Sequence, residues 1–135
     1  MEYVLNNIDE THKFAREFAK KLHAPVTVAL RGDLGVGKSE IARTIIKTLC
    51  GENTVVPSPT FTLVQTYDAD GGHISHFDLY RVGDVAELTE IGLNHAIEND
   101  ITLIEWPDVA KDILPENTIF VDISEFGNGR KIIVH

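Results

Sequence analysis

The sequence predicts an α/β fold in which a mixed, mostly parallel central sheet lies between helices, and three observations carry this prediction. Short apolar runs typical of buried strands alternate with stretches of helical periodicity. A glycine-rich segment, residues 32–39, joins one such strand to the helix that follows it. A polar turn at residues 68–72 separates two strand-like runs and indicates a β-hairpin insertion in this pattern.

The N-terminal part of the chain is predicted to form a helix, a strand and a second helix. Asp9 is the expected N-cap of the first helix. The apolar face of that helix is formed by Phe14, Ala15, Phe18, Ala19 and Leu22. Residues 26–30 read as a buried strand, and the second helix ends near Gly51, a residue that suits the position after a helix. Two prolines keep the loop at residues 52–59 extended.

The rest of the chain is predicted to add the hairpin, three short helices and three strands. The hairpin pairs residues 61–67 with 73–80, and Asp84 caps a short helix that Gly92 ends. The remaining predicted elements are a helix over 93–98, a buried strand over 101–104, a helix over 109–114, and strands over 119–123 and 131–134.

Length and composition fit one domain spanning residues 1–135. The chain is 43% hydrophobic and 24% charged, as globular domains are. Its net charge of −9 argues against direct binding of nucleic acid, because Lys and Arg supply most of the affinity for a phosphate backbone. Cys50 is the single cysteine, which fits a reducing compartment. Since no signal segment or membrane-length apolar run is present, we expect a cytoplasmic protein without membrane contact.

Residues 32–39 read Gly-Asp-Leu-Gly-Val-Gly-Lys-Ser, the G-x-x-x-x-G-K-S pattern of a phosphate-binding loop. Successive N–H groups of such a loop surround phosphate oxygens, and the helix that follows adds its positive end. We expect Lys38 to reach the β- and γ-phosphates and Ser39 to bind Mg²⁺. The residues expected to bind the nucleotide here are Gly35, Val36, Gly37, Lys38, Ser39 and Glu40. With a strand before it and a helix after it, the loop predicts a three-layer P-loop NTPase fold.

An acidic side chain on a neighbouring strand is expected to complete the Mg²⁺ site. Glu105 closes a predicted buried strand, and Asp78 follows an alternating one. Glu105 fits better as the acid of a central parallel strand, and Asp78 is placed beside it to hold a metal-bound or attacking water. The alternatives are that Glu105 caps a helix beginning at Pro107 and that Asp78 pairs with Arg81.

Five other positions are candidates for contacts with the nucleotide. Thr60 and Thr62 lie where hydroxyl groups of a loop could sense the γ-phosphate. No Asn-Lys-x-Asp segment that would read guanine is present, so adenine is favoured, with Thr11 and Arg130 as candidates for holding the base. Trp106 could cover a nucleotide or a partner, and a place in the core is an equally good interpretation.

Two histidines on the same predicted strand, His73 and His76, resemble a metal pair. Because residues three apart on a strand point to opposite faces, a structural zinc site there is not expected.

Four segments together carry a family resemblance: the phosphate loop, S-P-T-F-T-L-V at 58–64, H-F-D-L-Y-R at 76–81 and L-I-E-W-P at 103–107. In this order, and over nearly the whole chain, they resemble the TsaE family, small ATPases of bacterial tRNA threonylcarbamoyladenosine biosynthesis. The resemblance implies a P-loop ATPase that docks on the TsaB and TsaD proteins and resets their complex between turnovers. It implies that tRNA is reached only indirectly, through that complex.

The resemblance also implies roles for single residues. Lys38 would bind phosphate, Ser39 and Glu105 would hold Mg²⁺, Asp78 matches the Walker B-like acid, and Trp106 matches the tryptophan beside the acid. Thr60 and Thr62 fall in a switch-like loop.

One position departs from the family pattern. Where the family usually has another Thr after G-K-S/T, this chain has Glu40. Because a carboxylate beside the α-phosphate would be repelled, we expect Glu40 to point outward.

The expected reaction is hydrolysis of ATP to ADP and phosphate, by positioning and electrostatics. No arginine is an evident finger, so Arg81 or a partner would have to supply one. We therefore expect the isolated chain to hydrolyse ATP slowly and its partners to change the rate. Two other readings stay open: a small-molecule kinase, for which no Arg-rich lid is seen, and a nucleotide-gated binding module in which hydrolysis is incidental.

Overall fold

The computed structural model describes all of residues 1–135, which form a mixture of strands and helices. The elements are β1 (Glu2–Leu5), α1 (Ile8–Ala19), β2 (Val26–Arg31), α2 (Lys38–Cys50), β3 (Val64–Ala69), β4 (Gly72–Asp78), α3 (Val85–Glu90), α4 (Leu93–Asn99), β5 (Ile101–Glu105), the 3-10 helix η1 (Pro107–Ala110), β6 (Ile119–Phe126) and β7 (Gly129–Val134). None of the helices combines the length and the apolar character that crossing a bilayer requires.

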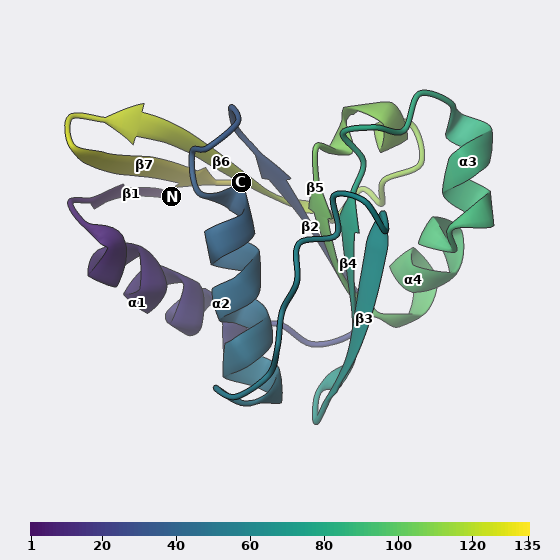
Figure 1. Cartoon of the computed structure of the whole chain (residues 1–135), viewed down its shortest axis with the longest axis horizontal. Coiled ribbons are helices and arrows are strands. Elements are labelled where there is room, and N and C mark those ends of the chain that lie inside the picture. The colour runs from purple at the N-terminus through teal and green to yellow at the C-terminus, as the bar shows by residue number, and fades with distance from the viewer.

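The seven strands form one sheet in the order β1-β7-β6-β2-β5-β4-β3. The four central strands, β6, β2, β5 and β4, run parallel to one another. At one edge β7 pairs antiparallel with both β6 and β1, and at the other edge β3 pairs antiparallel with β4. Figure 1 shows α1 and α2 on one side of the sheet and α3 and α4 on the other. The predicted mixed sheet between helices is therefore confirmed, and the hairpin β3–β4 extends this sheet.

Two apolar clusters hold the layers together, one on each face of the sheet. The larger cluster packs Ile41 and Ile45 of α2 against Leu103 of β5, and the smaller one packs Leu88 of α3 against Ile104 of β5. Leu103 and Ile104 are neighbours in the chain and contribute to opposite faces, as the alternation of a strand requires. Burying one such aliphatic side chain contributes about 1.5–3 kcal/mol.

The start of the chain differs from the prediction in two ways. The N-cap of α1 is Asn7, whose Oδ1 accepts a hydrogen bond from the Glu10 N–H at 2.9 Å, so the prediction of Asp9 was wrong. Residues 2–5 also form β1, a strand that was not predicted. Pairing with β7 adds to the strand propensity of Tyr3 and Val4 in this short segment. Asn7, which follows β1, has the extended conformation that a cap needs.

Two other boundaries differ. The hairpin turn contains only Asp70 and Gly71, and β3 begins at Val64 because Leu63 has a φ of 70°, which interrupts the strand. The helix predicted over 109–114 is replaced by the single turn η1, which begins at Pro107. A proline suits a first helical position because that position needs no N–H partner.

Candidate nucleotide-binding site

The phosphate loop connects β2 to α2 at the carboxyl edge of the parallel strands, in the place the motif predicts. Gly32 has a φ of 154°, and a Cβ there would lie 2.5 Å from the Ile123 carbonyl oxygen. Gly37 precedes α2 with a φ of 117°, in the left-handed region that favours glycine. The two glycines therefore allow the chain to turn sharply and enter α2 at Lys38.

Lys38 is buried at the first position of α2. Its ammonium group donates to the carbonyl oxygens of Gly32 and Asp33 and lies 3.7 Å from the centroid of the Trp106 ring. Burial lowers the pKa of Lys38, although the carboxylates of Glu105 and other nearby acids act in the opposite direction. The ammonium group is thus held over the loop by two carbonyl oxygens and an aromatic ring, and phosphate oxygens could take the place of these contacts.

Glu105, at the end of β5, is hydrogen-bonded from two sides. Ser39 Oγ donates to Oε1 at 2.8 Å, and His76 Nε2 lies 2.6 Å from Oε2. Glu105 therefore does not cap η1, whose N-cap is Trp106 without a side-chain hydrogen bond.

Asp78, at the end of β4, is the second acid of the site. Its Oδ2 accepts from Thr60 Oγ1 at 3.1 Å, and its Oδ1 accepts from the Tyr80 N–H at 3.0 Å. The alternative pairing with Arg81 is absent, because that guanidinium lies over the Phe61 ring at 4.5 Å. Asp78 and Glu105 face each other in the parallel register of β4 and β5.

These side chains line one cavity, which we call the phosphate cavity. Its lining residues are Leu34, Gly35, Gly37, Lys38, Ser39, Glu40, Thr60, Asp78, Glu105 and Trp106. The fold thus brings together most of the residues that the sequence singles out. Thr62 is not among them, because its hydroxyl accepts from Gln65 Nε2 at 2.9 Å outside the cavity. Trp106 lines the cavity and has a φ of 57°. The interpretation of Trp106 as a core residue is therefore wrong.

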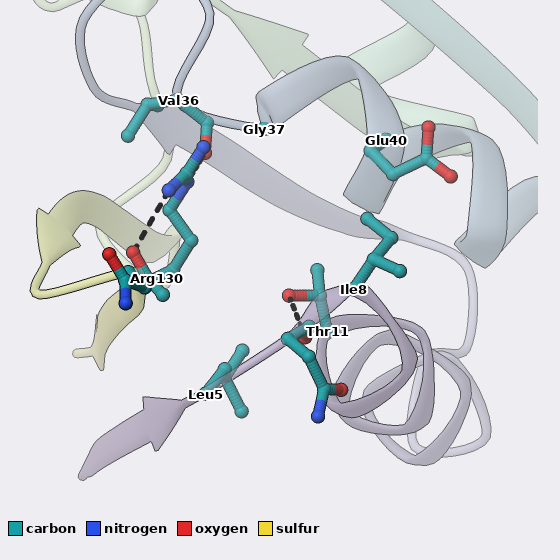
Figure 2. A pocket seen from close by; sticks show the side chains of 10 residues that line it. Leu5, Ile8, Thr11, Val36, Gly37, Glu40 and Arg130 are labelled. Carbon is teal, nitrogen blue, oxygen red and sulfur yellow. Dashed lines mark hydrogen bonds between the residues drawn. The ribbon is translucent and has the colours of Figure 1, made fainter.

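A second pocket lies beside the phosphate cavity and shares Gly37 and Glu40 with it. Figure 2 shows Thr11 of α1 and Arg130 of β7 on two sides of this pocket, with Leu5 and Ile8 contributing apolar surface. The complete lining is Leu5, Asn7, Ile8, Thr11, Val36, Gly37, Glu40, Asn128, Gly129 and Arg130. Arg130 Nε donates to the Val36 carbonyl at 2.6 Å and so ties β7 to the phosphate loop.

Glu40 lines both pockets, and its carboxylate is directed to basic side chains of α1 and α2. Its Oε1 lies 2.6 Å from His12 Nε2, and its Oε2 accepts from Arg43 at 2.7 Å. The carboxylate is therefore engaged with basic side chains, in agreement with the expectation that it points outward.

The donor atoms of the phosphate cavity fit a Mg²⁺ ion. A hydroxyl and two carboxylates, from Ser39, Asp78 and Glu105, line the same space, and hard oxygen donors of this kind suit magnesium.

Sequence reasoning missed His76 as a residue of this site. Its side chain is 2% exposed and is hydrogen-bonded to Glu105. The available signal was the spacing of His76 and Asp78, which stand two residues apart on one strand and so share a face.

Comparison with known proteins shows the family of this chain. The family described as "Threonylcarbamoyl adenosine biosynthesis protein TsaE" matches residues 5–132. Relatives named tRNA threonylcarbamoyladenosine biosynthesis protein TsaE include one from Rickettsia bellii, 43% identical over 96% of this chain and 90% of its own length. Another, from Haemophilus influenzae, is 40% identical over 89% of this chain and 79% of its own length. The crystal structure of Bacillus subtilis YdiB superposes with a TM-score of 0.78 and 25% identity, covering 98% of this chain and 82% of that one. The chain belongs to the TsaE family of threonylcarbamoyl adenosine biosynthesis proteins.

Proposed function

We propose that this chain is the ATP-binding and ATP-hydrolysing subunit that supports tRNA threonylcarbamoyladenosine synthesis by acting on a complex of TsaB and TsaD. The observation that carries the proposal is the phosphate cavity, where Lys38 and Ser39 of the phosphate loop meet the strand-end acids Asp78 and Glu105. A purely structural member of the complex would have no need of this set of side chains.

The chain's own residues would divide the work of phosphoryl transfer. Lys38 and the loop N–H groups would hold the β- and γ-phosphates, and Thr60 would keep Asp78 oriented toward the attacking water. Ser39, Asp78 and Glu105 would hold Mg²⁺, which when bound offsets the negative charge of the phosphoryl oxygens.

The second pocket suits the base of the nucleotide. It borders the phosphate loop at Val36 and Gly37, so a nucleotide whose phosphates lie in the loop can extend into it. Apolar side chains and the Thr11 hydroxyl would contact an adenine ring. Arg130 would hold the phosphate loop in place through its hydrogen bond to the Val36 carbonyl.

No arginine is among the residues that line the phosphate cavity. Because an arginine finger contributes about 10³-fold or more to such reactions, the isolated chain should hydrolyse ATP slowly. The partner complex would raise the rate, and the hydrolysis step would in turn reset that complex.

The test is a pull-down of TsaB and TsaD with and without ATP, using the unaltered chain and Lys38→Ala. We expect nucleotide-dependent association of the unaltered chain and its loss in the variant. Lys111→Ala, an exposed lysine beyond η1, is the matched control and should associate normally. Equal association of Lys38→Ala with and without ATP, at the level of the unaltered chain with ATP, would refute the proposal.

A further inference from the structure

We infer that His76 is a positioning residue, which fixes the Glu105 carboxylate so that Glu105 can hold Mg²⁺. The inference rests on the proposed function and adds a residue to it. His76 lies on β4, and its Nε2 stands 2.6 Å from Glu105 Oε2, with only 2% and 3% of the two side chains exposed.

The first argument concerns the freedom of a glutamate side chain. The terminal torsion of glutamate is broad, so one hydrogen bond leaves the carboxylate plane free to turn. Ser39 holds only Oε1, and His76 holds the other oxygen from a different element. With partners on α2 and β4, the plane of the carboxylate is set by two rigid elements.

The second argument concerns the place of His76 relative to the cavity. In the register of β4 and β5, Asp78 stands opposite Glu105, and His76 stands two residues earlier, opposite Leu103. His76 is therefore on the same face as Asp78 but deeper in the sheet, and it is not among the residues that line the phosphate cavity. Its side chain contacts Glu105 from within the sheet, outside the phosphate cavity, and so does not reach a nucleotide bound there.

The third argument comes from the other ring nitrogen. Since Glu105 Oε2 accepts, the hydrogen of this contact lies on Nε2, and Nδ1 is buried without any hydrogen-bond partner. A buried polar atom without a partner disfavours folding. An apolar side chain at position 76 would make the fold more stable than a histidine with an unpartnered Nδ1. The hydrogen bond from Nε2 to Glu105 therefore accounts for the presence of a histidine here.

The geometry also selects the variants that test the inference. The amide nitrogen of His76→Gln can reach the position of Nε2, whereas the shorter His76→Asn places its amide near Nδ1, away from Glu105. The exposed His73 on the same strand provides the matched control, His73→Asn. Where His76→Asn does not fold, judged by thermal unfolding, His76→Leu takes its place, because an apolar side chain suits the buried position.

ADP affinity is measured with Mg²⁺ and with EDTA, and kcat and KM are measured for ATP. We expect His76→Asn to reduce the Mg²⁺-dependent gain in affinity, and kcat, by about 10–100-fold. Affinity in EDTA should stay unchanged, His76→Gln should recover most of the loss, and His73→Asn should match the unaltered chain.

Three results would overturn the inference, and they separate it from the proposed function. If the unaltered chain shows a Mg²⁺-dependent gain that His76→Asn keeps, the inference alone is wrong. If His76→Asn loses ADP affinity equally in EDTA, His76 has a general structural role instead. If the unaltered chain binds ADP equally with and without Mg²⁺, the proposed metal site fails and the inference fails with it.

Discussion

Ser39 Oγ donates a hydrogen bond to Glu105 Oε1 at 2.8 Å, which joins the first turn of α2 to the carboxyl end of β5. The two residues are 66 positions apart in the chain, and each is held by a regular element of the fold. A hydroxyl and a carboxylate brought together in this way can share a cation without any rearrangement of the backbone. The phosphate cavity thus lies where the carboxyl ends of two parallel strands meet the phosphate loop and α2.

We predict that Glu105→Ala abolishes ATP hydrolysis. Losing one of the two acids removes several kcal/mol of transition-state stabilisation, so phosphate release should fall about 100-fold or more. The measurement is phosphate release in the presence of the partner complex. Glu125→Ala, an exposed acid on β6, is the control and should hydrolyse normally.

The same variant separates hydrolysis from binding. If Glu105→Ala still supports tRNA modification by the partner complex while its hydrolysis is gone, the chain is a nucleotide-gated binding module and hydrolysis is incidental. Loss of both activities supports the reset proposed above.

We predict that Thr11→Phe weakens binding of adenine nucleotides but not of tripolyphosphate. Thr11 lies in the wall of the second pocket, so a larger side chain there would fill the space proposed for the base. ADP affinity should fall about tenfold or more, which corresponds to about 1.4 kcal/mol. Calorimetric titration of the two ligands is the measurement, and Thr66→Phe, at an exposed threonine of β3 outside both pockets, is the control. An equal fall for both ligands would mean that the pocket does not hold the base.

The phosphate loop and its flanking elements could be predicted because their chemistry is local. The spacing of Gly32, Gly37, Lys38 and Ser39 fixes a loop, and the apolar patterns on both sides fix a strand and a helix. Glu105 could be predicted from its place at the end of an apolar run, since the carboxyl ends of parallel strands meet at one edge.

What could not be predicted depends on pairing between distant segments. β1 pairs with β7 at the far end of the chain, and four residues carry too little pattern to reveal that pairing. Thr62 lies outside the phosphate cavity, where its hydroxyl accepts from Gln65, and no local signal in the sequence distinguishes it from Thr60. The contact of His76 with Glu105 depends on the register of β4 and β5, which only the folded sheet defines.

We predict that Gly32→Ala strongly destabilises the fold. A Cβ at residue 32 would lie 2.5 Å from the Ile123 carbonyl oxygen and 2.7 Å from Val36 Cγ1, and the φ of 154° adds strain. The expected loss in the free energy of unfolding is about 2–4 kcal/mol, read from urea denaturation. Gly83→Ala is the control, because a Cβ there would meet nothing within 4 Å. Similar midpoints for the two variants would show that the turn after β2 is not as tight as described.

We predict that an ion pair between β2 and β6 makes stability depend on pH in acid. Arg31 donates to both carboxylate oxygens of Asp122, at 2.5 and 2.8 Å, and His135 lies 2.6 Å from the same carboxylate. Desolvation tends to raise the pKa of Asp122, but the hydrogen bonds from Arg31 and His135 outweigh it and hold the pKa below its usual value. Because the native pKa is depressed, the contribution of Asp122 is complete above the unfolded pKa of about 4 and is lost as the pH falls through the native value.

Asp122→Asn should therefore be less stable than the unaltered chain at pH 7, and the difference should shrink as the pH falls below about 4. About a third of each side chain is exposed, so solvent screening limits the expected loss at pH 7 to about 1 kcal/mol. Urea denaturation at a series of pH values between 7 and 2 measures it, with Glu125→Gln as an exposed control on the same strand. A difference that stays constant down to pH 2 would show that the pair contributes by packing and not by its charge.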